Sequence, residues 1–238
     1  MLQACLNGAR TPREHHHLPV RPEHLARAAA DSRAAGATEI HLHPKTPDGA
    51  DSLDPHLLAS TLRAVRAAVP GTPIGVTTGA WVLPGVDERL AAIRGWNILP
   101  DHASVNWHES GADRLAELLG ERGIGIEAGI SSGTDAAERF ARSPMRAHVQ
   151  RVRAEVTDPT ARGAPITADA LLRGIGAAPV PVLLHGESAG AWPVLHRAVQ
   201  RGLDIRIGLE DTLQLADGTI ASDNAELVTA AERLRQSA

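Results

Sequence analysis

The sequence predicts a single (β/α)₈ barrel formed by residues 1–238. Two patterns support this fold class. Short apolar runs of β type alternate eight times with longer helical patterns, and such alternation is typical of a parallel sheet. Several runs, including GIGIEAG and PVLLH, are almost continuously apolar, as buried parallel strands are. Eight strand–helix units in 238 residues fit this barrel, which usually needs about 250 residues.

The eight predicted units follow one another along the chain without a linker or low-complexity segment. The first run of β type, 2–8, is followed after a loop by a helical stretch from Pro22 to about Ala35, with apolar residues at Leu25, Ala28 and Ala29. In order, the strand–helix pairs are 2–8 with 22–35, 38–43 with 54–69, 73–79 with 86–94, 103–108 with 112–119, 123–129 with 134–142, 149–157 with 167–175, 180–185 with 191–201, and 204–210 with 224–234. The segment 158–165, DPTARGAP, is expected to be a loop.

A doubly wound open sheet is the main alternative fold. Such sheets usually contain fewer units and often carry a glycine-rich turn that binds a nucleotide. The sequence has no GxGxxG after its first strand and no GxxxxGK[ST], so both nucleotide-binding signatures are missing. The barrel is therefore the preferred prediction.

Composition narrows the classes of function. The formal net charge is −4 and only 2% of the residues are aromatic, which argues against a nucleic-acid-binding surface. One cysteine, Cys5, cannot form an internal disulfide. No apolar run reaches membrane-spanning length and the first residues do not resemble a secretory signal. We expect a cytoplasmic protein without membrane contact. We expect His15–His17 to lie in a solvated loop, although a metal site is the alternative.

Polar side chains collect where the predicted strands end. In a (β/α)₈ enzyme, the carboxyl ends of the strands and the loops after them form the active site. The residues at these ends are Asn7, Gly8, His41, His43, Thr77, Thr78, Gly79, Ser104, Asn106, His108, Glu127, Glu155, His185, Glu187, Arg206, Glu210 and Asp211. Apolar runs that repeatedly end in polar groups indicate one shared site.

His41 and His43 are the clearest metal-ligand candidates. Residues i and i+2 of a strand point to the same face, so both imidazoles can reach one ion. Glu210 can add a carboxylate from the neighbouring last strand. Two histidines and one glutamate with open positions are typical of catalytic zinc, with manganese, iron or cobalt as other possibilities. The alternative is a pair of ordinary polar residues at a strand mouth.

Arg206 lies four residues before Glu210, and Asp211 follows Glu210 directly. An acid and a base beside a metal-bound carbonyl compound suit an enolisation reaction. The alternative is a salt bridge between Arg206 and Asp211 that closes the barrel.

Other strand-end residues suit substrate binding. Thr77, Thr78 and Gly79 offer hydroxyl and backbone N–H donors for a carboxylate, unless they only form a turn before the next helix. Ser104 and Asn106 share one strand face, where Ser104 can hydrogen-bond to substrate.

Glu127 and His185 would be costly to bury without partners. We expect both to orient the metal ligands through hydrogen bonds.

Several motifs along the whole chain resemble the β-keto acid cleavage enzymes, whose best-known activity is 3-keto-5-aminohexanoate cleavage. They are LNGA (6–9), LPVRPEHLA (18–26), AAGATEIHLHPK (34–45), TTG (77–79), SVN (104–106), IEAGI (126–130) and RIGLEDTLQLADGTIASDNAELV (206–228). The HLH and GLED pieces are the most specific.

The resemblance implies a (β/α)₈ barrel with zinc held by His41, His43 and Glu210. It implies Asp211 and Arg206 as the catalytic pair. By the same resemblance, Thr77 and Ser104 contact substrate. The implied reaction condenses a β-keto acid with acetyl-CoA, and a retro-Claisen step then releases acetoacetate and a new acyl-CoA. The resemblance also implies that the protein forms a homo-oligomer.

Departures from the family pattern bear on the substrate. Members that act on amino-bearing keto acids have an acidic residue after the first GA, where this chain has Arg10. Arg10 would repel an ammonium group, so we expect it to face an anionic or neutral substrate tail. Lys45, Ala80 and Thr212 also replace the family's usual residues.

Two other functions remain open at this stage. One is a metal-dependent lyase or hydrolase that acts on a β-keto or β-hydroxy acid without CoA. The other is a barrel that has lost catalysis and binds a small anion as a sensor. Intact His41, His43, Glu210 and Asp211 argue against the sensor. CoA-dependent turnover separates the first alternative from the acyltransferase.

Overall fold

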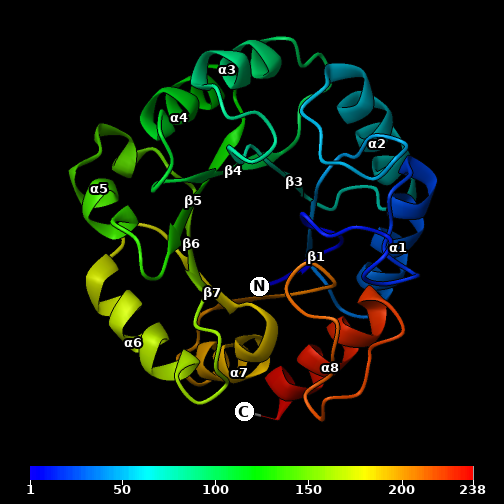
Figure 1. Cartoon of the computed structure of the whole chain (residues 1–238), viewed down its shortest axis with the longest axis vertical. Helices are drawn as coiled ribbons and strands as arrows, with labels where there is room; N and C mark the ends of the chain where they lie inside the picture. The colour runs from blue at the N-terminus through cyan, green and yellow to red at the C-terminus, as the bar shows by residue number, and fades with distance from the viewer. Residues whose placement is uncertain (238) are drawn as a thin grey trace.

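The computed structural model describes residues 1–237, in which eight parallel strands form a closed barrel with a helix following each strand (Figure 1). The strands are β1 (Leu2–Cys5), β2 (Glu39–Leu42), β3 (Ile74–Thr77), β4 (His102–Asn106), β5 (Gly125–Ser131), β6 (Arg151–Val156), β7 (Val182–Gly186) and β8 (Asp204–Ile207). The helices are α1 (Pro22–Ala34), α2 (Pro55–Ala68), α3 (Val86–Arg94), α4 (Ala112–Glu121), α5 (Ala136–Arg142), α6 (Ala164–Ile175), α7 (Ala191–Gln200) and α8 (Asn224–Gln236). Short 3₁₀ turns lie at Pro144–Ala147 and Ser188–Gly190. The predicted fold class is confirmed.

β8 closes the barrel by pairing with β1. Gln3 is in register with Arg206, and Cys5 is in register with His41 on the other side of β1. The amino group of Met1 also forms an ion pair with Asp204 at 2.7 Å. β1 therefore brings the beginning and the end of the chain together, next to the residues that end β2.

Each predicted strand and helix is present, but several ends differ. The largest functional difference is at β8, which stops at Ile207 instead of continuing to Glu210. The chain turns there, and the N–H of Asp211 donates to the carbonyl of Gly208 at 3.0 Å. Gly208 allows this turn because a Cβ at that position would lie 1.9 Å from the carbonyl oxygen of Cys5. Glu210 is therefore a turn residue and not a strand residue.

Two loop predictions also need correction. α6 begins at Ala164, inside the segment expected to be a loop, and Pro165 lies in its first turn, where proline is well tolerated. His15 is buried and its Nε2 lies 2.8 Å from the carbonyl oxygen of Ala221, so only part of the His15–His17 run is solvated. His16 and His17 are exposed.

Capping residues define where some helices begin. The side chain of Asp54 accepts hydrogen bonds from the N–H groups of His56 and Leu57 at the start of α2. Asp223 accepts from the N–H of Glu226 at the start of α8. These side chains satisfy backbone donors that have no partner within the first turn of a helix.

The apolar core lies between the strands and the surrounding helices. Along each strand, alternate side chains such as Ile40 and Leu42 on β2 or Val152 and Ala154 on β6 are fully buried in this layer. The other side chains of the strands point into the barrel, since successive residues alternate between the two faces. Within residues 1–237, none of the helices has the length and apolar character needed to span a lipid bilayer.

The inside of the barrel is unusually polar. Arg151 on β6 donates to the carboxylates of Glu39 on β2 and Glu127 on β5. The side chain of Gln3 reaches the same two carboxylates, at 2.6 and 3.2 Å. Branched apolar side chains usually fill such interiors. Here a hydrogen-bonded polar layer takes their place beneath the strand ends, and we call its residues Gln3, Glu39, Glu127 and Arg151 the barrel floor.

Candidate active site

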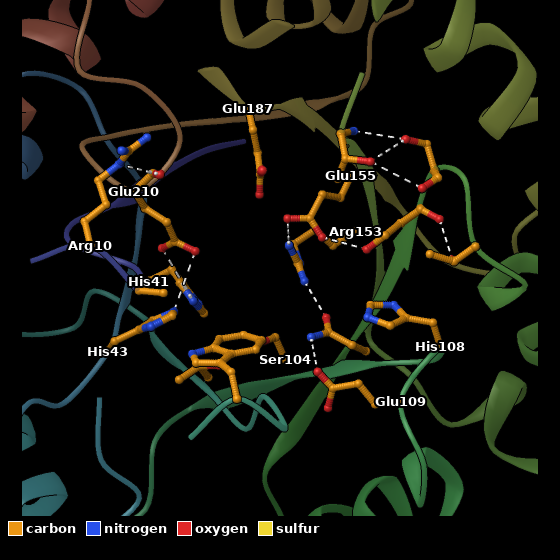
Figure 2. A pocket seen from close by; sticks show the side chains of 18 of the residues that line it. Arg10, His41, His43, Ser104, His108, Glu109, Arg153, Glu155, Glu187 and Glu210 are labelled. Atoms are coloured by element: carbon orange, nitrogen blue, oxygen red, sulfur yellow. Dashed lines mark hydrogen bonds and ion pairs between the residues drawn. The ribbon is translucent and has the colours of Figure 1, made fainter. Parts of the chain in front are cut away.

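A cavity of about 540 Å³ opens at the carboxyl ends of the strands. Its lining comes from the ends of several strands and from the loops after them, which is where enzymes with this barrel have their active sites. The residues are Ala9, Arg10, Glu14, His41, His43, Thr77, Trp81, Ser104, Asn106, His108, Glu109, Ser131, Ser132, Thr134, Arg153, Glu155, Thr157, Glu187 and Glu210. Figure 2 shows His41, His43 and Glu210 on one side of this cavity and Arg153 and Glu155 on the other.

His41, His43 and Glu210 place their ligand atoms within 4.8 Å of one another. The Nε2 of His43 lies 3.6 Å from Oε1 of Glu210, and the Nε2 of His41 lies 3.9 Å from Oε2. Oε2 is buried and has no hydrogen-bond partner within residues 1–237. Two imidazole nitrogens and a carboxylate oxygen that converge in this way fit one divalent transition metal.

Gly8 makes room for the glutamate of this group. Its φ is +55°, and a Cβ there would lie 2.2 Å from Cγ of Glu210. The glycine of LNGA is thus required both by its backbone conformation and by the close approach of the turn after β8.

Asp51 holds His43 from behind. Its Oδ2 lies 3.0 Å from Nδ1 of His43 and accepts a hydrogen bond from Nε1 of Trp81 at 2.9 Å. Its other oxygen accepts from Nζ of Lys45 at 2.6 Å. A carboxylate on the outer nitrogen fixes the ring orientation and directs Nε2 toward a metal. Trp81 also stacks on His43, with 5.9 Å between ring centroids.

The protonation states of His41, His43 and Glu210 favour the binding of a cation. Burial lowers the pKa of His41 to about 3, so its imidazole is neutral. Burial also opposes charge on His43, but the carboxylates of Glu210 and Asp51 outweigh it and raise the pKa of His43. The pKa of Glu210 is well below its usual range, because Arg206 and the two histidines overcome the effect of burial. A metal ion would replace the proton on His43.

Arg206 joins the metal-ligand candidates to Asp211. Its Nη2 lies 2.5 Å from Oε1 of Glu210 and 3.0 Å from Oδ1 of Asp211. The thiol of Cys5 donates to Oδ2 of Asp211 at 2.8 Å, and Nδ1 of His185 lies 3.4 Å from Oδ1. Burial favours a neutral Asp211, but Arg206 and His185 lower its pKa. Asp211 is therefore ionised. Asp211 and Arg206 are both buried, and neither is among the residues that line the cavity.

Of the five residues expected to contact substrate at β3 and β4, three line the cavity: Thr77, Ser104 and Asn106. The side chain of Thr78 instead donates to the carbonyl oxygen of Ser104 at 2.7 Å. Gly79 lies beneath Trp81, where a Cβ would approach the ring to 2.0 Å. Thr78 and Gly79 therefore shape the turn, and they are absent from the cavity lining.

Glu109 fixes the turn after β3. Its carboxylate accepts from the N–H of Ala80 at 2.9 Å, from Arg89 at 2.7 Å and from Asn106 at 2.9 Å. This one side chain connects the TTGA turn to the end of β4.

Arg10 lines the cavity near the metal-ligand candidates. Its Nε donates to the carbonyl oxygen of Glu210 at 3.1 Å, and its Nη1 forms an ion pair with Glu14 at 3.0 Å. The expected contact of Arg10 with a substrate tail remains a prediction.

Glu127 and His185 bind partners other than the metal-ligand candidates. The carboxylate of Glu127 accepts from Arg151 at 2.5 Å. His185 lies between Arg153, at 3.2 Å, and Asp211. Among the interactions of residues 1–237, neither side chain hydrogen-bonds to His41, His43 or Glu210. His185 thus lies beside Asp211, and the carboxylate that contacts a ligand histidine from behind is Asp51.

Sequence patterns could have indicated some of the residues that were not assigned a role. In β6, charged Arg151, Arg153 and Glu155 alternate with apolar residues, which is typical of a strand with one polar face. Asp51 and Trp81 lie in loops, and no pattern in the sequence predicts their contact with His43.

Glu39, His102 and Glu127 form a second group with metal-ligand spacing, toward the opposite end of the barrel. Arg151 already supplies a positive charge to both carboxylates. The negative charge of Glu39 and Glu127 is therefore balanced within the protein, and we assign this group to the barrel floor rather than to a metal site.

Comparison with known proteins is consistent with this arrangement. The whole chain, residues 1–238, matches the β-keto acid cleavage enzyme family. The chain belongs to that family. As a member, it is an enzyme that acts on β-keto acids.

The names of two relatives of this β-keto acid cleavage enzyme state an activity. A 3-keto-5-aminohexanoate cleavage enzyme from Fusobacterium nucleatum is 27% identical over 253 aligned positions, which cover 98% of this chain and 90% of the relative. A 3,5-dioxohexanoate:acetyl-CoA acetone transferase from Paraburkholderia graminis is 34% identical over 97 residues, or 40% of this chain and 30% of the relative.

Solved structures with the same fold include ObcA in a binary complex with oxaloacetate. The TM-score is 0.70 at 16% identity, over 91% of this chain. This chain spans only 63% of the length of ObcA. At this identity the likeness supports the barrel fold alone.

Proposed function

We propose that this enzyme is zinc-dependent and transfers acyl groups between a β-keto acid and acetyl-CoA. The observation that carries the proposal is the convergence of His41, His43 and Glu210 within 4.8 Å of one another, beside the Arg206–Asp211 pair. The names of the Fusobacterium nucleatum and Paraburkholderia graminis relatives support the substrate class and the use of acetyl-CoA.

His41, His43 and Glu210 would hold the zinc ion. Two neutral imidazoles and one carboxylate leave open positions, which is the pattern of catalytic rather than structural zinc. The chemistry that zinc supplies when bound is Lewis-acid polarisation of the substrate carbonyl oxygens. Such polarisation makes the protons on the carbon between the two carbonyl groups more acidic.

Asp211 is the proposed base. It is ionised because Arg206 and His185 lower its pKa despite burial, and it lies next to Glu210 in sequence. It takes a proton from the carbon between the keto and carboxylate groups of the substrate. Arg206 holds the carboxylate of Asp211 in place. As a fixed cation, Arg206 also stabilises the negative charge of the enolate that forms.

The exchange then follows from the chemistry of the two substrates. The enolate carbon attacks the thioester carbonyl of acetyl-CoA, and CoA leaves as a thiolate. The thiolate attacks the original keto carbonyl, and the bond between that carbonyl and the enolate carbon breaks. The products are a new acyl-CoA and the enolate of acetoacetate, which takes its proton back from Asp211. Thr77 and Ser104 line the cavity where their hydroxyl groups can hydrogen-bond to the substrate.

Isotope transfer tests this function. The purified zinc-loaded enzyme is incubated with a β-keto acid and acetyl-CoA labelled with ¹³C in both acetyl carbons. The proposal predicts acetoacetate labelled in its carbonyl and methyl carbons, and an unlabelled new acyl-CoA. Products that form equally well without acetyl-CoA would indicate the CoA-independent lyase or hydrolase instead.

A further inference from the structure

Trp81, which follows β3, lines the cavity beside His43. It is 51% exposed, whereas Trp96 and Trp107 are only 2% and 1% exposed. Burial of apolar surface holds those two rings in the core, but it stabilises the position of Trp81 much less. The position of Trp81 therefore depends on other contacts.

Two contacts of Trp81 converge on one metal-ligand candidate. Its indole Nε1 donates to Oδ2 of Asp51 at 2.9 Å, and the same oxygen lies 3.0 Å from Nδ1 of His43. The indole ring also stacks on the imidazole, with 5.9 Å between the ring centroids and 26° between the planes. Trp81 thus contacts His43 directly and also holds the carboxylate behind it.

Trp81 separates His43 and Asp51 from water. Their side chains are only 3% and 5% exposed, although both contact the half-exposed indole. The indole therefore lies on their solvent side. Without it, water would reach Oδ2 of Asp51 and compete with the imidazole for that oxygen. Lys45 would still bind Oδ1 at 2.6 Å, but this contact holds only the other oxygen of the carboxylate.

The backbone on both sides of Trp81 is held in place. The N–H of Ala80 donates to the carboxylate of Glu109 at 2.9 Å, and Arg89 forms an ion pair with the same carboxylate at 2.7 Å. The N–H of Val82 donates to the carbonyl oxygen of Gly79 at 3.1 Å. The turn after β3 therefore presents the indole to Asp51 in one position.

Gly79 provides the space that the indole occupies. A Cβ at Gly79 would lie 2.0 Å from Cζ3 and 2.2 Å from Cη2 of Trp81. The φ of Gly79 is outside the left-handed region that favours glycine, so the backbone there is one that alanine also adopts. A glycine is required at this position because the ring lies directly against its α-carbon.

We propose that Trp81 is a positioning residue of the metal site. It holds the carboxylate of Asp51 against Nδ1 of His43 and keeps water away from that contact, and Gly79 makes room for it. The inference rests on the zinc ion of the proposed function, but neither the β-keto acid nor acetyl-CoA enters it. Because Trp81 acts through Asp51 and His43, its loss should weaken zinc binding without removing a ligand.

Two substitutions of Trp81 test this role through zinc affinity. Competition with a chelator of known affinity measures the zinc dissociation constant, without substrate or acetyl-CoA. Trp81→Phe keeps a ring but loses the N–H donor, and the dissociation constant should rise by about threefold to tenfold. Trp81→Leu loses both contacts, and the rise should be about 10- to 100-fold.

Trp192→Phe is the matched control for these substitutions. The indole of Trp192 donates to the carbonyl oxygen of Gln214 at 2.7 Å, and Trp192 is absent from the cavity lining. Its loss removes an indole hydrogen bond of the same kind at a different place. The zinc dissociation constant of Trp192→Phe should equal that of wild type.

Combined substitutions identify the path by which Trp81 acts. In an Asp51→Ala background, Trp81→Phe should change zinc affinity by less than about twofold, because the hydrogen bond has already been lost. Gly79→Ala should weaken zinc binding in the wild-type background and have almost no further effect in Trp81→Leu. Equal effects of Gly79→Ala in both backgrounds would remove Gly79 from the proposal.

The indole N–H gives a spectroscopic test of the same contact. In protein labelled with ¹⁵N in tryptophan, the NMR signal of Trp81 is the indole signal that Trp81→Phe removes. This signal should shift when zinc binds, and its proton should exchange with water faster in Asp51→Ala. A signal that responds to neither change would show that the indole is not coupled to Asp51 and the metal site.

The outcomes separate this role from the proposed function. Wild-type zinc affinity in both Trp81 variants would overturn the positioning role and leave the zinc enzyme intact. A loss in Trp81→Leu alone would show that the ring acts without its N–H, and would overturn the hold on Asp51. If zinc affinity depends on Trp81 as expected but no acyl exchange occurs, the proposed reaction fails and the positioning role stands. A wild-type protein that binds no zinc would overturn both.

Discussion

The Nδ1 of His43 lies 3.0 Å from Oδ2 of Asp51, a residue eight positions further along the chain. Asp51 in turn holds the ammonium group of buried Lys45 at 2.6 Å. One imidazole nitrogen is therefore committed to a fixed carboxylate, and only Nε2 is free to face Glu210. His41 has no equivalent support, since its Nδ1 is buried without a hydrogen bond within residues 1–237.

Asp51→Asn should weaken zinc binding by about 10- to 100-fold, the usual effect of losing a carboxylate behind a histidine ligand. The asparagine can still accept a hydrogen bond but no longer increases the basicity of the ring. Competition with a chelator of known affinity measures the zinc dissociation constant. Asp48→Asn, in the same loop but exposed, is the control. An unchanged dissociation constant in Asp51→Asn would remove Asp51 from this role.

Asp211→Asn should retain zinc and lose about 10²- to 10⁴-fold in turnover, the range for loss of a general base. The enzyme-catalysed exchange of the substrate's C2 protons with D₂O should fall to the same extent, and NMR can follow it without acetyl-CoA. Zinc content equal to wild type shows that the site is intact. Proton exchange at the wild-type rate would rule out Asp211 as the base.

Glu127→Gln should lower the free energy of unfolding by about 3–5 kcal/mol, because it leaves the buried guanidinium of Arg151 with an incomplete set of partners. Burial alone would raise the pKa of Glu127, but Arg151, His102 and Arg153 lower it overall. Chemical denaturation measures the change. The exposed Glu138→Gln should stay within about 0.5 kcal/mol of wild type. A similarly small effect in Glu127→Gln would mean that the barrel floor does not depend on this ion pair.

Glu187→Gln should alter the pH dependence of stability. The pKa of Glu187 rises from 4.5 to about 8 on folding, so the folded protein retains a proton that the unfolded chain loses over this window. The contribution of Glu187 is therefore fully present below pH 4.5 and is lost as the pH rises toward 8. The Tm of Glu187→Gln relative to wild type should increase across the same range. A constant Tm difference would contradict the raised pKa.

The sequence was sufficient to predict the barrel, because buried parallel strands and helices alternate with little interruption. It also indicated His41, His43, Glu210 and Asp211, since the ends of parallel strands meet at one mouth. Side-chain alternation alone placed Glu210 on β8, whereas the close contact between Gly208 and Cys5 ends the strand earlier.

The supporting residues could not be predicted in the same way. Asp51 contacts His43 because the loop after β2 folds back on itself, with Lys45 and Asp51 forming an isolated bridge. The Glu127 carboxylate binds Arg151 rather than a metal ligand, and this depends on how side chains share the barrel interior. Such contacts depend on loop paths and packing, which periodicity does not specify.

The central claim is that His41, His43 and Glu210 hold one divalent metal. The most direct test is the metal content of the purified protein, measured by mass spectrometry for wild type and for His41→Ala. The account predicts about one zinc ion per chain in wild type and almost none in His41→Ala, with both proteins folded. Equal metal content in the two proteins, or none in wild type after purification with zinc, would contradict it.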